Sequence, residues 1–406
     1  MSVNIWTDYK QLPLPEVLSF IVDNRGKTVP IDENGTHVLI ATNCIRNEYL
    51  YPSYDKVRYL NEETYQTWFR AHPLPGDIIF VNKGTPGRVC MVPDPVDFCI
   101  AQDMMAFRVN PEIVDNKYLF AILRSYKIQS QIAATTIGDV IPHFKKQHLH
   151  EIKIPIPPID IQKQIGDFYY LLCEKEVINN KINDNLAAQI ETFLLAYLNS
   201  EGALPVKLGD YLYIKGRIGW KGLKKSEYLS QSEYRIINGE TLTQSGIDWN
   251  KAGYISEERY VESPEIMLKV GDILLSKDGT IGKIGYVDSL ELPTSVASGI
   301  FVIRNTKPDI ISTTFIYYLL KSRLFTSFIA ARTEGSVIPH LYQKDFMEFE
   351  FPLPTAEKMA EFEEVTEPMF SGIINNLNEN KKLAILRDSL LPKLMSGELD
   401  VSELDL

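Results

Sequence analysis

The sequence has few of the features that would assign it to a class directly. Its 406 residues include four scattered cysteines and no CxxC pair (Cys44, Cys90, Cys99, Cys173). A disulfide framework and a zinc site are therefore both disfavoured, and a reducing cytoplasm is the expected location. No run of about 18 apolar residues occurs, so no membrane span is expected. The opening MSVNIWTDYK does not show the charged-then-apolar pattern of a secretion signal.

Known catalytic motifs are also missing. The sequence contains no GxxxxGK[ST] phosphate loop, no glycine-rich S-adenosylmethionine loop, no NPPY-like methylation motif and no HExxH. The nearest string to a methylation motif, IPPI at 156–159, has neither the polar residue nor the aromatic one. Asp77 and Asp272 precede expected strands, and we interpret them as structural. The chain is therefore expected to be no enzyme and to hold no metal or cofactor of its own.

Positive charge is in short supply, which at first argues against a nucleic-acid partner. The net charge is −11, but it is uneven: segments 151–201 and 346–406 carry −4 and −8, whereas 1–150 and 202–345 carry −1 and +2. Acidic segments repel a phosphate backbone and fit a protein partner or solvent better. Any contact with DNA is thus expected on local basic faces of the two large, nearly neutral segments.

An internal repeat is the strongest feature that is present. GDIIFVNKGTPGRVCMV (76–92) and GDILLSKDGTIGKIGYV (271–287) share seven of 17 positions. Further on, GDVIPHF (138–144) matches GSVIPHL (335–341), and IPIP matches FPLP, again about 197 residues later. Three collinear matches at a nearly constant offset indicate a tandem duplication of about 200 residues.

Each half ends in a proline-rich connector followed by a long amphipathic helix. We predict helices over 160–199 and 355–391, with Asp160 and Thr355 as N-caps and Pro368 as a possible kink. The seam of the first helix is predicted to include Ile178 and Ile182, and that of the second to include Leu377. Pairing of the two helices as an antiparallel coiled coil buries both stripes most economically. The alternative is that each helix packs on its own domain.

The segments before the helices read as β-rich with some helix. Gly76-Asp77 opens a strand, a glycine-rich turn follows at 84–87, and Val89 to Val92 returns as a hairpin, with the same plan in the second copy. Helices are expected over 118–133 and 315–331. The predicted fold class is therefore α+β, with two tandem domains of small sheets and helices.

In the order, duplication and spacing of these motifs, the chain resembles the specificity subunits of type I restriction–modification systems. The motifs are GD-I-(I/L) followed by GT-x-G, VIPH, the proline-rich connector and the terminal LLPKLMSGELDV. The resemblance implies target recognition domains at 1–154 and 201–351, each reading half of a gapped DNA sequence. It also implies helical spacers at 155–200 and 352–406.

The resemblance further implies double-stranded DNA and two methyltransferase subunits as partners, with restriction subunits able to join, in a phage-defence role. S-adenosylmethionine would then belong to the methyltransferase, and ATP and Mg²⁺ to the restriction subunit. A methylation-only or fused type II system with a similar chain stays open. A nuclease or transferase built on a duplicated domain, and a two-headed protein scaffold without DNA binding, are the alternatives from other classes.

The candidate DNA contacts form three groups. A basic, glycine-rich patch lies in IKGRIGWKGLKK of the second half and, in shorter form, in DNRGKTVP of the first half. The hairpin loops and the VIPH turns add hydroxyl, histidine and lysine side chains. For each group a purely structural loop is the alternative. The candidates are Arg25, Lys27, Lys83, Thr85, Arg88, His143, Lys145, Lys146, Lys215, Arg217, Trp220, Lys221, Lys224, Lys225, Lys277, Thr280, Lys283, His340, Tyr342 and Lys344.

Overall fold

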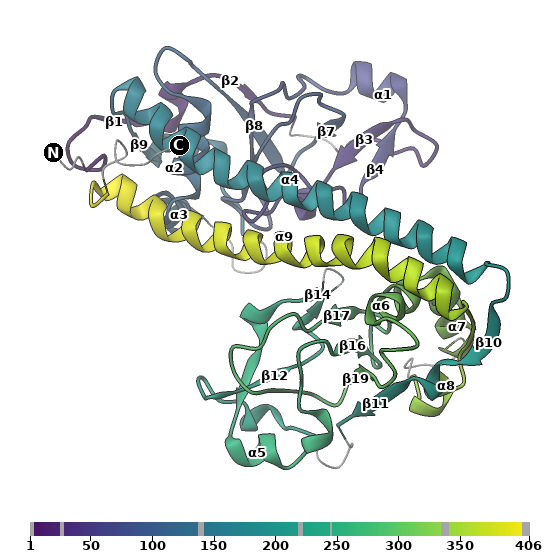
Figure 1. Cartoon of the computed structure of the whole chain (residues 1–406). Helices are drawn as coiled ribbons and strands as arrows, with labels where there is room; N and C mark the ends of the chain where they lie inside the picture. Colours follow the sequence, from purple (N-terminus) through teal and green to yellow (C-terminus); the bar gives the residue numbers. More distant parts are fainter. Residues whose placement is uncertain are drawn as a thin grey trace. The chain divides into compact units, whose positions relative to one another are not determined.

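The chain forms two compact units that reuse one α+β plan. A computed structural model describes residues 4–24, 28–136, 142–217, 222–243, 246–333 and 341–399. Unit 1 comprises Met1–Lys181 with Leu377–Leu406, and unit 2 comprises Ile182–Asn376 (Figure 1). Each unit therefore contains one α+β domain and one part of each long helix.

Unit 1 is built on two small sheets. The larger one is antiparallel with the order β2-β8-β5-β6, and the smaller one has the order β4-β3-β7 with β3 and β7 parallel. A separate two-stranded sheet joins β1 to β9. The strands are β1 (Gln11–Pro13), β2 (Leu18–Val22), β3 (His37–Ile40), β4 (Arg58–Leu60), β5 (Ile78–Val81), β6 (Val89–Met91), β7 (Phe98–Ile100), β8 (Met104–Val109) and β9 (Lys153–Pro155).

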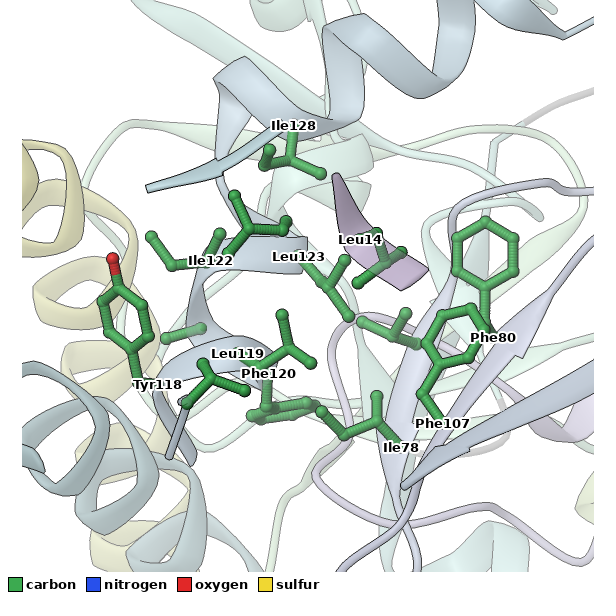
Figure 2. Close-up of a cluster of buried hydrophobic side chains, with 14 of the residues drawn as sticks. Leu14, Ile78, Phe80, Phe107, Tyr118, Leu119, Phe120, Ile122, Leu123 and Ile128 are labelled. Carbon is green, nitrogen blue, oxygen red and sulfur yellow. The ribbon is translucent and has the colours of Figure 1, made fainter. Parts of the chain in front are cut away.

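The main core of unit 1 lies between the larger sheet and helix α2 (Asn116–Arg124). Phe80 and Phe107 from the sheet face Leu119, Phe120 and Leu123 of the helix in Figure 2, and all are buried. The β5–β6 hairpin contributes a run of buried apolar residues, because its strands are covered on both faces. The predicted hairpin is confirmed, with Ile78 opposite Met91.

Unit 2 repeats this plan with matching strands. Its larger sheet has the order β11-β19-β16-β17, its smaller sheet β15-β12-β18, and β10 pairs with β20. A further small hairpin joins β13 to β14. The strands are β10 (Leu204–Lys207), β11 (Leu212–Gly216), β12 (Tyr234–Ile237), β13 (Leu242–Thr243), β14 (Gly246–Ile247), β15 (Gly253–Ile255), β16 (Ile273–Ser276), β17 (Ile284–Tyr286), β18 (Thr294–Val296), β19 (Ile300–Asn305) and β20 (Glu350–Leu353).

The two single helices predicted after the hairpins are in fact two pairs of helices. In unit 1, α2 ends before Ser125 and α3 (Tyr126–Thr135) begins after it, because the Ser125 hydroxyl accepts a hydrogen bond from the Ile128 amide and caps the new helix. Unit 2 breaks in the same way at Ser322, between α6 (Thr313–Lys321) and α7 (Arg323–Thr333). Short α-helices are also described at α1 (Glu62–Thr67), α5 (Glu257–Val261) and α8 (Gln343–Met347).

The two long helices are α4 (Ile159–Leu198) and α9 (Ala356–Ser396). Thr355 caps α9 as predicted, through the Lys358 amide, whereas Asp160 lies inside the first turn of α4. Helix α9 passes through Pro368 without a break. It ends at Ser396, later than predicted, and the following Gly397 has a φ of +74°, a conformation that terminates helices.

Within each unit the halves of α4 and α9 run antiparallel to one another. In unit 1, Asn179 donates to the side-chain oxygen of Asn380 at 2.9 Å, and Arg387 contacts Glu176 at 3.3 Å. In unit 2, Asn376 donates to the side-chain oxygen of Asn183 at 2.9 Å, and Tyr197 contacts Glu361. Residues that come later in α4 thus meet residues that come earlier in α9.

The central part of the predicted seam is wrong. Ile178 and Ile182 are more than 40% exposed and Leu377 is 38% exposed, while Asn179 and Asn183 are buried. The isoleucines and the asparagines form neighbouring stripes with the same i, i+4 spacing, so periodicity alone cannot choose between them. Asparagines on α9 decide the choice, because they offer hydrogen bonds to the buried amides. Among the described residues, no helix is long and apolar enough to cross a membrane.

Candidate nucleic-acid interface

The structure brings two of the predicted contact groups together in unit 1. The hairpin loop after β5 lies beside the segment that follows VIP, although more than fifty residues separate them in the sequence. The Gly84 amide donates to the Pro142 carbonyl at 2.9 Å, the Phe144 amide donates to the Asn82 carbonyl at 2.8 Å, and Lys83 forms an antiparallel bridge with His143. We call residues 83–88 together with 142–146 the loop pair of unit 1.

Unit 2 repeats this contact with different side chains. The Leu341 amide donates to the Lys277 carbonyl at 3.1 Å, which matches the bond from Phe144 to Asn82. Residues 277–283 with 341–344 are therefore the loop pair of unit 2. In each unit the described residue that directly follows the histidine of VIPH therefore lies against the strand end before the hairpin loop.

Glycines shape both hairpin loops. Gly84 and Gly87 have φ of +85° and +93°, and Gly279 and Gly282 have φ of +67° and +89°. These are left-handed conformations that residues with a Cβ rarely adopt. An added Cβ at Gly84 or Gly279 would meet nothing within 4 Å, so backbone conformation alone requires the glycine there. A glycine without a side chain also leaves the backbone open to close approach by a ligand.

The loop pair of unit 1 presents exposed cations. Lys83, Lys145 and Lys146 are exposed, while Thr85, Arg88 and His143 are half-buried. Nearby carboxylates offset part of this charge, since Lys146 contacts Asp23 at 3.1 Å and Lys83 lies 3.8 Å from Asp103. The pair of Lys83 with Asp103 is exposed on both sides and therefore weak, so a phosphate can compete for Lys83. Asp23 is only 12% exposed, so its pair with Lys146 is held more firmly.

Unit 2 distributes its charge differently. Lys224, Lys225, Thr280, Tyr342 and Lys344 are exposed, while Lys215, Lys277 and Lys283 are half-buried. The Lys277 ammonium lies over the Phe301 ring, 5.0 Å from its centroid, and burial lowers the pKa of Lys277. The Lys283 ammonium donates to the Gly239 carbonyl at 3.0 Å. The exposed lysines, rather than those in the hairpin itself, are the stronger candidates here.

Arg217 is not a surface residue, and its place among the predicted contacts is corrected. Its side chain is fully buried, with Nε donating to the Val296 carbonyl at 3.1 Å and one Nη donating to the Ser295 hydroxyl at 3.4 Å. The guanidinium satisfies polar groups at the end of β18. The sequence predicted that Arg217 belongs to an exposed basic patch, because glycines and lysines surround it in the sequence. Arg25, Lys27, Trp220, Lys221 and His340 lie outside the described residues.

Several polar side chains outside the predicted contact groups hold loops together rather than pointing freely into solvent. Asn47 accepts a hydrogen bond from the Val89 amide, Arg46 pairs with Asp55, and Arg235 donates to the Trp249 carbonyl. Asn238 accepts from two backbone amides of its own turn. Exposed side chains on β4, Arg58 and Tyr59, were not singled out from the sequence. Their exposure on an edge strand is visible only in the fold.

Asp77 and Asp272 have the structural role that the sequence predicts. Asp77 is buried and accepts two hydrogen bonds from Arg108, at 3.0 and 2.9 Å, and Asp272 accepts two from Arg304, both at 2.6 Å. Each aspartate also accepts a backbone amide three residues earlier, from Leu74 or Lys269. Among the described residues, no group of three or more histidine, cysteine or carboxylate side chains is placed to hold a metal ion.

Comparison with known proteins agrees with this duplicated arrangement. The family model for the type I restriction modification DNA specificity domain matches the chain twice, at residues 16–188 and 204–383. The chain is 25% identical over 329 residues to the type I restriction enzyme MjaVIII specificity subunit of Methanocaldococcus jannaschii, covering 75% of each chain. It is 28% identical over 402 residues to the HindI specificity subunit of Haemophilus influenzae, covering 80% of this chain and 86% of that one.

A solved structure supports the fold. The S subunit of a type I restriction–modification system from M. genitalium superposes with a TM-score of 0.55 at 19% identity, covering 95% of this chain and 96% of that one. The two matches to the family model coincide with the two units in which the same strand order recurs. The chain therefore belongs to the type I restriction modification DNA specificity family, whose members are non-catalytic.

Proposed function

We propose that this chain is the DNA-recognition subunit of a type I restriction–modification complex and that each unit reads one half of a gapped target. The observation that carries the proposal is the double match to the DNA specificity domain, one match in each unit of the same fold. Two similar domains in one chain act on DNA as a dimer does, with two half-sites. Their described surfaces differ, so the two half-sites are expected to differ.

The loop pairs are the proposed points of contact with the phosphate backbone. Their exposed lysines, which include Lys83, Lys145, Lys146 and Lys344, are flexible point charges that suit phosphates. The same proposal includes Lys224 and Lys225 in unit 2. Phosphate contacts set the position of a protein on DNA but do not select its sequence. Base selection is thus expected from side chains that differ between the units.

Partner enzymes supply the chemistry in this proposal. Two methyltransferase subunits would bind S-adenosylmethionine, and restriction subunits would bind ATP and Mg²⁺. Exposed apolar side chains on the long helices offer the methyltransferases a surface: Leu171 and Ile178 on the α4 half in unit 1, and Ile182 and Leu195 on the half in unit 2. Leu171, Ile178 and Ile182 follow each other at helical spacing, and an exposed apolar stripe is a feature of surfaces that bind other proteins. Pairing of α4 with α9 is the proposed spacer between the half-sites.

The decisive experiment is to co-express this chain with its candidate methyltransferase and to sequence methylated adenines in the host DNA. We expect a split motif with two unlike halves and a fixed gap. A continuous motif would contradict bipartite reading. Absence of new methylation from a complex shown to be intact by size-exclusion chromatography would contradict the role in DNA recognition itself.

A further inference from the structure

The helix pair of unit 1 contains a buried ion pair. Arg387 on α9 has a side chain that is 6% exposed, and both carboxylate oxygens of Glu176 on α4, 14% exposed, lie 3.3 Å from its guanidinium. Arg387 also contacts the carboxylate of its neighbour Asp388 at 2.9 Å. Either charge would be costly to bury without its partner.

The repeat offset places apolar residues at the equivalent positions of unit 2. An offset of 197 carries Glu176 of α4 onto Ile373 of α9, and Ile190 of α4 onto Arg387 of α9. Ile190 and Ile373 are both buried in the main core of unit 2. The same interhelical layer is therefore ionic in unit 1 and apolar in unit 2.

This asymmetry matters because α4 and α9 are copies of one helix. Within one chain α4 pairs with α9. Two copies of the chain could instead form a dimer in which α4 pairs with the α4 of the second copy and α9 pairs with the α9 of the second copy. The asparagine layers permit this exchange, because the offset relates the bond between Asn179 and Asn380 to the bond between Asn376 and Asn183. Other contacts permit it as well: Leu391 and Met395 are buried in unit 1, and Leu194 and Leu198 are buried at the equivalent positions in unit 2.

The ionic layer does not permit the exchange. Pairing of α4 with a second α4 sets each Glu176 against Ile190, and pairing of α9 with a second α9 sets each Arg387 against Ile373. Each Glu176 would then be buried against an apolar group, and each Arg387 would keep only its neighbour Asp388, whereas internal pairing of α4 with α9 gives every charge its partner across the helices. The geometry points to Glu176 and Arg387 as a selectivity device that makes α4 pair with α9 of its own chain and disfavours self-association of the chain through like helices.

The device is tested by making the layer symmetric in the full-length chain. In the double variant Glu176→Leu with Arg387→Leu, both kinds of pairing bury apolar groups. Two copies with different affinity tags are co-expressed, and capture of one copy through the tag of the other is measured, followed by the molar mass of the captured species. We expect cross-capture to rise at least about tenfold over the wild-type chain and the captured species to be a dimer.

Two further variants keep the test decisive. The charge reversal Glu176→Arg with Arg387→Glu stays asymmetric and is expected to show cross-capture at the wild-type level. Ile190→Arg with Ile373→Glu makes each helix complementary to its own copy by a second route, and decides the question if the leucine variant does not fold. Wild-type levels of cross-capture in whichever symmetric variants fold, judged by circular dichroism, would overturn the proposal, as would a rise in the charge reversal equal to theirs.

Discussion

The two units use different side chains to bind the same backbone carbonyl. In each unit the side chain follows the first strand of the larger sheet, and the carbonyl lies at the end of a strand of the smaller sheet. In unit 1, Asn24 follows β2 and donates to the carbonyl of Ile100, the last residue of β7, at 3.1 Å. In unit 2, Arg217 follows β11 and donates to the carbonyl of Val296, the last residue of β18, also at 3.1 Å. Both units keep a side-chain hydrogen bond to this carbonyl, although the residue that donates it differs.

Other positions are retained without change. Asp77 with Arg108, and Asp272 with Arg304, occupy equivalent places and make the same two-pronged contact. The difference indicates that the sheet scaffold holds its charged pair strictly, while the polar groups at its edges diverge.

Loss of either buried aspartate is expected to have the largest effect. Asp77→Asn and Asp272→Asn each leave an arginine without its carboxylate, and each should lower the free energy of unfolding by about 2–3 kcal/mol. The value lies below that of a fully buried pair because both arginines keep about 30% of their surface in water. Urea unfolding of both variants measures it. Glu112→Gln and Asp309→Asn, both exposed, are the matched controls, and unequal effects of the two aspartates would break the equivalence of the units.

A smaller effect is expected from the two edge residues that differ. Arg217→Leu leaves the Val296 carbonyl unsatisfied, and Asn24→Ala does the same to Ile100, so each should cost about 1–3 kcal/mol of stability. DNA binding by folded Arg217→Leu should keep the wild-type dependence on salt, because the side chain is buried. A reduced salt dependence, measured by titration at several salt concentrations, would return Arg217 to the DNA contacts.

Much of the fold was accessible from the sequence because the duplication doubles every signal. The hairpins and the presence of both long helices follow from motifs and periodicity that occur twice. The breaks at Ser125 and Ser322 were missed because the apolar periodicity continues across them, and a serine cap leaves no mark stronger than a surface serine. The buried asparagine stripe was missed because its partners lie about 200 residues away.

The candidate site was less accessible. The sequence identified the hairpin and VIPH motifs separately, and nothing local indicated that the Phe144 amide reaches the Asn82 carbonyl. The side chain of Arg217 is buried because it binds polar groups at the end of β18, almost eighty residues later in the sequence. Charge counted along a segment cannot tell an exposed lysine such as Lys224 from a buried arginine seven residues before it.

Exposed lysines should affect DNA binding without affecting stability. Lys224→Ala with Lys225→Ala in unit 2 is expected to weaken binding and to reduce the slope of log K against log salt by about 1–2, as loss of one or two phosphate contacts would. Lys145→Ala with Lys146→Ala is the matched pair in unit 1. Binding is titrated at several salt concentrations with the chain bound to the proposed methyltransferase partner, and thermal unfolding serves as the control. An unchanged slope in one unit would restrict phosphate contact to the other.

The smallest expected effect, a change in how stability depends on pH, comes from another position at which the units differ. In unit 1, His37 stacks on Tyr65 and lies 2.6 Å from Glu62, and this hydrogen bond lowers the pKa of Glu62 below its usual 4.5. In unit 2, Tyr234 lies against Tyr260, and its hydrogen bond to Glu257 raises the pKa of Tyr234 above its usual 10.

The two arrangements should respond to opposite ends of the pH range. A lowered carboxyl pKa contributes stability that is present above about 4.5 and is lost as pH falls through the lowered value. A raised tyrosine pKa contributes stability that is present below about 10 and is lost as pH rises through the raised value. Thermal unfolding across pH should therefore show the difference between wild type and Glu62→Gln vanishing in acid, and that between wild type and Tyr234→Phe vanishing in alkali. If both stability differences vanish at the same end of the pH range, His37 and Tyr234 do not make equivalent contacts in the two units. The equivalence of the units would then extend only to their buried ion pairs.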